Sequence, residues 1–387
     1  MPSRPPSAPP LHPDTLAVRA GAEPDAETGA LSPPLHLATT FAHAVDGHRD
    51  DGLLYQRREH PTGRRLESAL AALDGGARAL FFGSGVAAGT AVLHAVPVNG
   101  TVLVQDDLYS GFRVQMQRYA ERWRLRIRRC NLTDLDTVRA ALREPTALVW
   151  AETPSNPLLR VIDIAALAEL THTAGARLLV DSTFATPVLQ QPLALGADLV
   201  LHSATKYMGG HSDVMGGVLV FAGDDAWAEA AFSAREFIGL HGSPFSAWMV
   251  LRGLRSLPAR MQRHATNAAR VARFLAGHER VAAVHYPGLD EHPGHALAAR
   301  QMRAFGGMLS FRVAGGRDAA LGVASRLALF VNATSLGGCE SLVEHRASTE
   351  GPDTETPADL LRLSVGLEHP DDLIADLDQA LAGGVAD

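Results

Sequence analysis

Residues 197–213 read ADLVLHSATKYMGGHSD, and they join an apolar run to a turn that contains a lysine. The segment 197–203 is typical of a buried strand, because its aliphatic side chains suit a sheet that is covered on both faces. This strand leads directly into the turn with Lys206. A lysine ammonium normally lies on a solvated surface, so Lys206 either caps a helix or takes part in chemistry.

The rest of the chain repeats this pattern of short apolar runs separated by segments of helical length. Such a pattern predicts an α/β fold with a mostly parallel sheet between layers of helices. The runs before residue 255 are 79–82, 101–105, 125–130, 147–152, 177–181, 198–202 and 216–221. Beyond residue 255 the pattern changes to a long helix, further strands and a last helix, which indicates a smaller α+β domain. These segments are 256–278, 308–313, 327–331, 360–365 and 371–382.

We therefore expect an N-terminal arm over 1–60, a large domain over 61–255 and a small domain over 256–387. The proline-rich start, residues 1–14, is predicted to be flexible. With 46% hydrophobic and 20% charged residues, the chain has the composition of a soluble globular protein. Its net charge of −7 argues against nucleic acid or an anionic membrane as a partner. Two cysteines and no apolar run of about 18 residues indicate a cytoplasmic protein.

Polar or glycine residues follow five of the predicted strands. In open α/β sheets, ligands bind in the crevice beyond the carboxyl ends of the strands. Each residue alone has a structural explanation as a helix cap or a turn, but five such strand ends together predict a ligand site. They are Gly83–Gly85, Asp106–Tyr109, Ser155–Asn156, Asp181, and Ser203–Lys206.

The chemistry of these residues indicates one cofactor. Asp181 ends an apolar strand, so its carboxylate needs a cationic partner such as a protonated ring nitrogen. Ser84, Ser203, Thr205 and the N–H groups after Gly85 are suited to a phosphate at a helix N-terminus.

Three further side chains complete the prediction of a ring-shaped cofactor. Tyr109 offers a face for stacking, and Asn156 offers a hydrogen bond to a phenolic oxygen. The Lys206 amine forms a Schiff base with an aldehyde. Together these groups predict pyridoxal phosphate (PLP).

Several segments resemble the PLP-dependent cysteine and methionine metabolism family. This family contains cystathionine γ-synthase, cystathionine β- and γ-lyases, methionine γ-lyase and the O-acylhomoserine sulfhydrylases. The resemblance runs from about residue 13 to the end and implies the aspartate-aminotransferase-like fold type I, with a seven-stranded large domain. It rests on YQRREHPTGRRLE (55–67), ETPSNPLL (152–159), residues 180–217, SLGGCESL (335–342) and residues 360–381.

The resemblance also implies roles for individual residues. Lys206 is similar to the Schiff-base lysine, Asp181 to the partner of the pyridine nitrogen, and Tyr109 to the stacking tyrosine that assists proton transfer. The expected phosphate ligands within the subunit are Ser84, Gly85, Val86, Ser203 and Thr205.

Other roles implied by the resemblance concern the substrate and a second subunit. Tyr55 and Arg57 match a motif that reaches the phosphate of a neighbouring subunit, which implies a dimer and usually a dimer of dimers. Asn156, Ser335 and Arg362 match substrate-side positions. In LLRLSV (360–365) the alternation also leaves Arg362 facing away from the apolar side, where it either grips an α-carboxylate or pairs with an acid such as Glu368.

Departures from the family pattern leave the substrate open. His60 replaces the usual asparagine, Phe112 replaces a small polar residue, and segment 346–359 is shorter than usual. The reactive cysteine of methionine γ-lyase would fall at Gly111. Glu340 matches an acidic position of γ-synthases and γ-lyases, where it either holds the distal ammonium of cystathionine or pairs with Arg346.

We therefore expect a PLP-dependent lyase or transferase acting at the γ carbon of a sulfur-containing or homoserine-derived amino acid. Cystathionine β-lyase, O-acylhomoserine sulfhydrylase and methionine γ-lyase activities are alternatives. An NAD(P)-dependent oxidoreductase is a distant one, because GSGVAA (83–88) with Asp106 fits a dinucleotide-binding pattern. A non-catalytic scaffold is not favoured, because Lys206 and Asp181 are both present. No metal site is expected, since His202 and His211 suit a role in orienting the turn.

Overall fold

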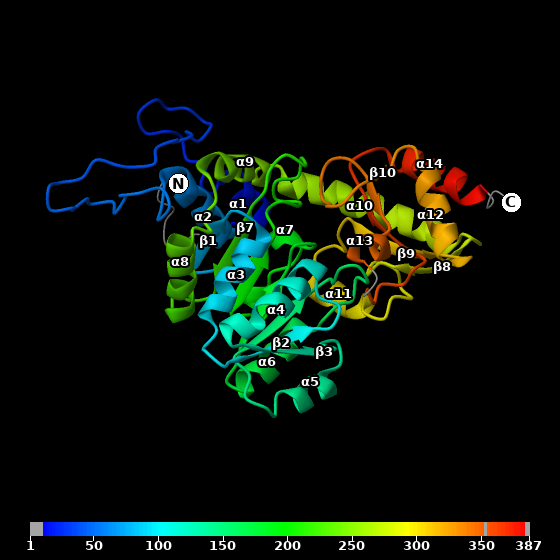
Figure 1. Ribbon diagram of the computed structural model, residues 1–387. Coiled ribbons are helices and arrows are strands. Elements are labelled where there is room, and N and C mark those ends of the chain that lie inside the picture. The colour runs from blue at the N-terminus through cyan, green and yellow to red at the C-terminus, as the bar shows by residue number, and fades with distance from the viewer. Residues whose placement is uncertain (1–10, 352–353, 384–387) are drawn as a thin grey trace.

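The computed structural model describes residues 11–351 and 354–383, and this part of the chain contains two β-sheets (Figure 1). The first sheet has the strand order β1-β7-β6-β5-β4-β2-β3. β7 is antiparallel to both of its neighbours, and the other pairs are parallel. The predicted mostly parallel seven-stranded sheet is therefore confirmed. Its strands are β1 (Arg78–Phe82), β2 (Thr101–Gln105), β3 (Arg126–Cys130), β4 (Leu148–Glu152), β5 (Arg177–Asp181), β6 (Leu199–His202) and β7 (Gly217–Phe221).

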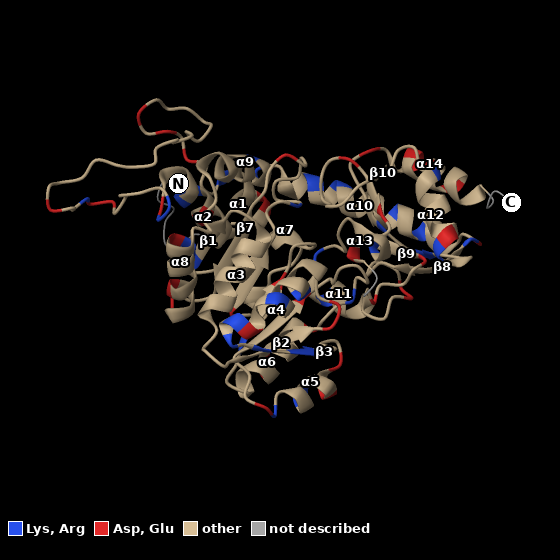
Figure 2. Ribbon diagram, viewed as in Figure 1, with Lys and Arg blue, Asp and Glu red and all other residues tan. Residues whose placement is uncertain are grey.

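Helices cover both faces of this sheet, which explains why its central strands are apolar throughout. In β4, Leu148 and Trp150 pack toward one helical layer, whereas Val149 and Ala151 pack toward the other. Charged side chains are sparse in the middle of the sheet, and β3 at its edge carries arginines (Figure 2). The first layer contains α3 (Gly85–Ala95), α4 (Ser110–Trp123) and α8 (Ala226–Ile238); the second contains α2 (Pro61–Asp74), α6 (Ile164–Thr173), α7 (Thr186–Leu189) and α9 (Pro244–Leu254).

The second sheet has the order β10-β11-β12-β9-β8 and packs against helices near the C-terminus. Its strands are β8 (Val281–His285), β9 (Met308–Val313), β10 (Val331–Asn332), β11 (Leu342–Glu344) and β12 (Leu360–Ser364). The packed helices are α10 (Leu257–Ala276), α12 (Gly316–Arg326) and α14 (Pro370–Ala382). The remaining helices are α1 (Pro13–Arg19), α5 (Leu135–Ala141), the 3₁₀ helix η1 (Pro192–Leu195), α11 (His295–Gln301) and α13 (Arg346–Glu350).

The predicted strand over 327–331 is wrong, because only Val331 and Asn332 belong to a strand there. The N–H groups of Ala328, Leu329 and Phe330 donate instead to the carboxylate of Asp376, at 2.8–3.2 Å. Donors that bind a side chain of α14 are not available to a sheet ladder. An apolar run that binds a helix in this way has the same composition as a strand, so the pattern alone misassigned it.

Two strands of the second sheet were not predicted. β11 is three residues long, and β8 is partly exposed along most of its length. Short or partly exposed strands give a weak alternation signal. The other predicted strands agree with the structure to within one residue at each end.

The segment between α1 and α2 extends away from the body of the molecule (Figure 1). It is nearly free of regular structure and carries exposed apolar side chains, including Leu31, Leu37 and Val45. The domain boundaries at residues 60 and 255 stay predictions, although the two sheets lie on either side of residue 255. Residues 1–10 of the predicted flexible start lie outside the described residues. Within the described ranges, no helix is long and apolar enough to cross a membrane.

Candidate active site

A cavity of about 470 Å³ lies at the carboxyl ends of β1, β2, β4, β5 and β6, against the second sheet. The parallel strands bring residues that are far apart in the sequence to this one edge. Most of the residues predicted for the site line the cavity: Ser84, Gly85, Val86, Tyr109, Asn156, Asp181, Ser203, Thr205, Lys206, Ser335 and Arg362.

Lys206 follows β6 and is the only lysine in the sequence. Its Nζ donates a hydrogen bond to Ser335 Oγ over 2.8 Å. Burial and the nearby Arg362 guanidinium lower the pKa of this amine to about 8. A neutral amine is the nucleophilic form of lysine, so the cavity keeps Lys206 closer to its reactive state than water would.

Ser335 joins Lys206 to the substrate side of the cavity. Its backbone has φ +82°, in the left-handed region that L-residues seldom adopt. Its carbonyl oxygen accepts a hydrogen bond from Arg362 Nη2 at 2.8 Å, while its hydroxyl accepts from Lys206. This single residue therefore fixes the lysine and the arginine relative to each other.

Two buried carboxyl groups lie side by side at the ends of β4 and β5. Asp181 accepts hydrogen bonds from the N–H and the hydroxyl of Thr183, at 3.0 and 2.6 Å. Glu152 pairs with Asp181 across the sheet and accepts from the N–H of Tyr109 at 2.8 Å. Burial raises the pKa of Asp181, and burial together with the Asp181 charge raises that of Glu152. This environment favours a cationic ligand group beside the two acids.

The N-terminus of α3 forms another wall of the cavity. Ser84 caps this helix by accepting from the N–H of Ala87 at 3.1 Å. The N–H groups of Gly85 and Val86, the first residues of the helix, have no acceptor one turn earlier. A Cβ atom at Gly85 would lie 3.1 Å from the Cβ of Ser203, so glycine keeps this wall open next to the hydroxyl groups of β6 and its turn. Such a donor set suits a phosphate.

Aromatic side chains form the opposite side. Tyr109 and Phe112 meet edge to face with ring centroids 5.9 Å apart, and Phe112 packs on Trp150. A Cβ atom at Gly111 would lie 2.4 Å from the Tyr109 ring. A cysteine at position 111 would therefore displace Tyr109, which argues against the arrangement expected of methionine γ-lyase.

Arg362 points from β12 into the cavity, while its neighbours Leu361 and Leu363 pack in the core, as the alternation predicted. Its Nη1 donates to Asn156 Oδ1 at 3.0 Å, and its Nη2 also contacts Glu344. The alternative of an ion pair with an acid is thus also confirmed, but the acid is Glu344 and not Glu368, which accepts hydrogen bonds from Ser341.

Three predicted site residues do not line the cavity. Tyr55 and Arg57 are exposed in the N-terminal arm, where the guanidinium lies 5.1 Å from the tyrosine ring. Glu340 contacts Ser212, and the alternative pairing with Arg346 is wrong, because Arg346 binds Glu344 and Glu350. The roles given to Tyr55, Arg57 and Glu340 stay predictions.

Sequence reasoning missed several cavity residues, of which Glu152, Glu344 and Arg346 are charged. Glu152 ends an apolar strand as Asp181 does, so the argument used for Asp181 would also have found it. Glu344 and Arg346 gave no comparable signal, because β11, which ends at Glu344, is too short to give a strand pattern. The departure noted at position 60 has a local explanation: His60 Nδ1 caps α2 by accepting from the N–H of Gly63 at 3.0 Å.

Comparison with known proteins agrees with this geometry. The model of the Cys/Met metabolism PLP-dependent enzyme family matches residues 14–382. The chain belongs to this family. It is 48% identical over 375 residues to a cystathionine gamma-synthase of Mycobacterium tuberculosis, covering 95% of this chain and 96% of that protein. A cystathionine gamma-lyase of Dictyostelium discoideum is 41% identical over 380 residues, covering 95% and 97%.

The structure is also similar to a cystathionine gamma synthase of Xanthomonas oryzae pv. oryzae in complex with aminoacrylate and cysteine. The TM-score is 0.93 at 41% identity, with 97% of this chain and 98% of that chain covered. The protein is thus a fold type I PLP-dependent enzyme, and the dinucleotide and scaffold alternatives are wrong. The cavity fits the cofactor, because it combines a buried amine, an acid without a lysine or arginine hydrogen-bond partner among the described residues, and a helix N-terminus.

The lowered pKa of Lys206 predicts how the cofactor-free enzyme captures PLP. Only the neutral amine attacks the aldehyde, so the rate of covalent capture should rise with pH and level off above about 8. An ordinary lysine would give a rise extending to about 10.4. The measurement is borohydride trapping at each pH, followed by mass spectrometry of the peptide with Lys206.

The Lys206→Ala variant is the control for trapping at the chain's α-amino group. It should bind PLP without a reducible linkage and should not turn over substrate. A reducible linkage of wild-type extent in this variant would contradict the assignment of Lys206.

Proposed function

We propose that this enzyme catalyses elimination or replacement at the γ carbon of a homoserine-derived or sulfur-containing amino acid, as a cystathionine γ-synthase or γ-lyase. The observation that carries the proposal is the pairing of Lys206 and Arg362 through Ser335 in one cavity. This pairing suits an α-amino acid whose α carbon must lie beside the lysine amine. Similarity over nearly the whole chain to a γ-synthase and a γ-lyase supports the position of the leaving group.

In this proposal Arg362 and Asn156 hold the substrate. The guanidinium binds the α-carboxylate through charge-assisted hydrogen bonds. Asn156 fixes the plane of that guanidinium, since its Oδ1 accepts from Arg362 Nη1. The α carbon is then directed toward the Lys206 side of the cavity, because Ser335 fixes the two side chains relative to each other.

Lys206 Nζ carries the proton. Bound PLP supplies an electron sink for the negative charge that forms at the α carbon. The free amine removes the α-proton as a general base, and its pKa of about 8 is well matched to this task near neutral pH. Departure of a γ substituent also requires loss of a β-proton, and Nζ is the base that we assign to this step. Asp181 would keep the ring nitrogen of bound PLP protonated, and Tyr109 would stack on the ring.

We further propose that the active sites are shared in a dimer and that two dimers associate. Tyr55 and Arg57 lie in an extended arm with exposed apolar side chains, which suits contact with a second copy. In the neighbouring site their hydroxyl and guanidinium groups would bind the phosphate. Glu340 remains our candidate for the distal ammonium of cystathionine.

Product analysis tests the γ assignment. With L-cystathionine, elimination at the γ carbon releases cysteine and 2-oxobutyrate, whereas elimination at the β carbon releases homocysteine and pyruvate. We expect the first pair, or synthesis of cystathionine from an O-acylhomoserine and cysteine. Homocysteine and pyruvate as main products would instead make the enzyme a β-lyase.

Mixing two inactive variants tests the shared site. Arg57→Ala removes a group given to the neighbour, and Lys206→Ala removes a group of the subunit's own site. A mixed dimer contains one intact site, so mixing with subunit exchange should restore up to about a quarter of wild-type activity for random pairing. Arg362→Ala with Lys206→Ala is the matched control: both residues line the cavity of the same subunit, so a mixed dimer has no intact site and should show no recovery. No recovery in demonstrably mixed oligomers would contradict shared sites.

A further inference from the structure

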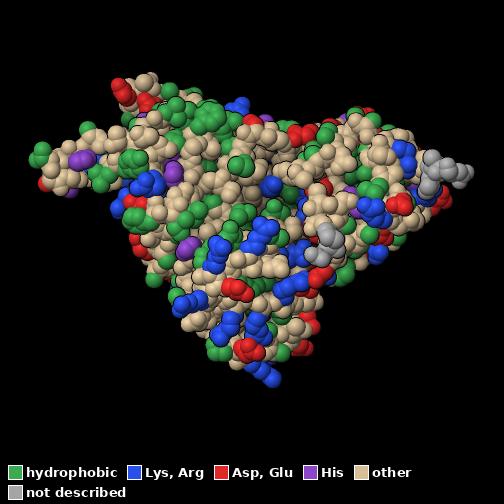
Figure 3. All heavy atoms as spheres, in the orientation of Figure 1, with side chains coloured by type: hydrophobic (Ala, Val, Ile, Leu, Met, Phe, Trp, Pro, Cys, Tyr) green, Lys and Arg blue, Asp and Glu red, His purple; other side chains and the backbone are tan. Residues whose placement is uncertain are grey.

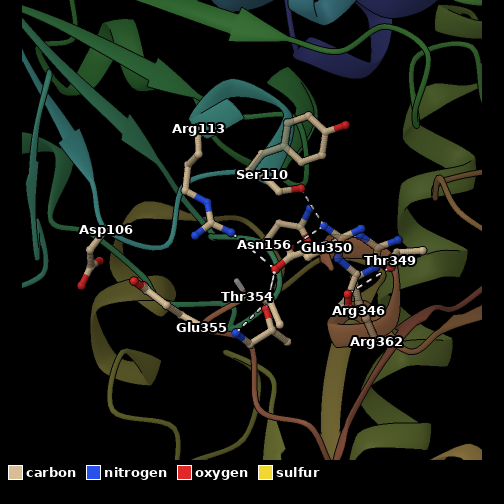
Figure 4. A network of polar contacts seen from close by, with 12 residues as sticks. Asp106, Ser110, Arg113, Asn156, Arg346, Thr349, Glu350, Thr354, Glu355 and Arg362 are labelled. Carbon is tan, nitrogen blue, oxygen red and sulfur yellow. Dashed lines mark hydrogen bonds and ion pairs between the residues drawn. The ribbon is translucent and has the colours of Figure 1, made fainter. Parts of the chain in front are cut away.

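Arg346 lies at the start of α13 and is buried against the cavity beside Arg362 (Figure 4). Its Nη1 donates to both carboxylate oxygens of Glu344 at 3.2–3.3 Å. Its Nη2 donates to Glu350 at 2.7 Å and to Ser110 Oγ at 3.2 Å. Arg346 belongs to the segment 346–359 that departs from the family pattern, and the proposed reaction gives it no role.

These contacts form a chain of alternating charges that leads to Arg362. Glu344 binds Arg362 on one side and Arg346 on the other, and Glu350 binds Arg346 and Arg113. The side chains of Glu344 and Glu350 are only 4% and 3% exposed. At such burial each carboxylate must be matched by nearby cations. Figure 4 shows Glu350 between Arg113 and Arg346, with Arg362 beside Arg346.

The charge of this cluster decides whether Arg362 is free to bind an anion. Three guanidinium groups, those of Arg113, Arg346 and Arg362, face two carboxylates, so one net positive charge remains. Without Arg346 the cluster would be neutral, and Glu344 would be matched by Arg362 alone. A guanidinium that is fully neutralised by its own carboxylate binds a second carboxylate weakly.

We propose that Arg346 is a positioning residue for Arg362. By binding Glu344, Arg346 keeps the Arg362 guanidinium in place and leaves the cluster with the net positive charge that binds the α-carboxylate of the substrate. The proposal rests on the α-carboxylate role given to Arg362 above. Glu350 supports the arrangement, because its carboxylate accepts hydrogen bonds from Thr354 and Thr356 as well as from Arg346 Nη2 and so holds the Arg346 guanidinium. In this proposal Arg346 acts through Arg362 and not on the reacting atoms.

The interactions on both sides of Arg346 agree with this role. Although burial acts in the opposite direction, Glu344 and Glu350 raise the pKa of Arg346, so it stays charged. Burial lowers the pKa of Arg362 to about 10, with Glu344 opposing that effect.

Outside the cavity, arginines also gather over α4 and β3, including Arg118, Arg122 and Arg129 (Figure 3), but these are exposed and are not part of the cluster.

The test compares two ligands that differ only at the α-carboxyl group. L-alanine and L-alaninamide each bind the PLP-loaded enzyme through the α-amine, and neither carries a γ substituent. Their apparent dissociation constants are measured from the visible absorbance of the cofactor. Because each variant is judged by the ratio of the two constants, a general loss of binding cancels. The assay also does not depend on which carbon loses its substituent.

Wild-type enzyme should prefer L-alanine. Arg346→Met should reduce this preference by about 10-fold or more, the scale of a hydrogen bond to a charged group. Arg346→Lys keeps the charge and should retain most of the preference. Arg129→Met is the matched control, because Arg129 forms an exposed ion pair with Glu355 and should leave the ratio unchanged. If Arg346→Met does not fold, Arg346→Gln provides the same comparison.

Three results would overturn the proposal. Equal weakening of both ligands by Arg346→Met would give Arg346 a merely structural role, and unchanged binding of both ligands would give it no role at this site. A loss confined to L-cystathionine, which carries a second carboxylate, would make Arg346 a contact for the substrate side chain. If wild-type enzyme itself showed no preference for L-alanine, the fault would lie with the α-carboxylate role of Arg362, whereas failure of the γ assignment would appear only in product analysis.

Discussion

Desolvation of one amine is the constraint on which this active site depends. Lys206 is the only lysine of the chain, and every other residue in its count of lysine plus arginine is an arginine. A guanidinium does not lose its proton in proteins, whereas a buried ammonium does so readily. In the cavity, burial and the permanent charge of Arg362 lower the pKa of Lys206 and so favour its neutral form. Ser335 fixes the direction of Nζ. Arg362, which stays charged, and Lys206, which loses its proton, therefore have separate roles in the site.

The two sheets supply different halves of the chemistry. The strand ends of the first sheet carry Lys206, Asp181 and the start of α3, which suit the cofactor. The second sheet carries Arg362, which suits the substrate carboxylate, and Glu344, which binds Arg362. Hydrogen bonds from Arg362 to Asn156 and from Lys206 to Ser335 connect the halves. A change of substrate can thus be accommodated around the second sheet and α13 while the cofactor side stays the same.

Much of this arrangement is predictable from the sequence because it depends on local patterns. Apolar runs gave the central strands, and a single carboxylate after such a run identified Asp181. Glu152 ends an apolar strand in the same way, so the same reasoning extends to it. That Lys206 is the only lysine of the sequence is a further signal that the residues alone provide. By contrast, the ion pairs of Arg362 with Glu344 and of Arg113 with Glu350 join distant segments, so no local pattern reveals that the charge cluster reaches Arg362 and α4. The strand expected at 327–331 failed for a related reason, because Asp376 binds its N–H groups from a distant helix.

Hydrogen exchange into an unreactive substrate analogue tests the account most directly. Chemistry at the γ carbon requires that the enzyme remove protons from both the α and the β carbon, whereas chemistry at the β carbon requires only the first. L-norvaline incubated with holoenzyme in deuterium oxide should therefore exchange its α- and β-protons, as followed by NMR, and Lys206→Ala should exchange neither. Exchange at the α carbon alone, or β exchange that persists in Lys206→Ala, would contradict the account.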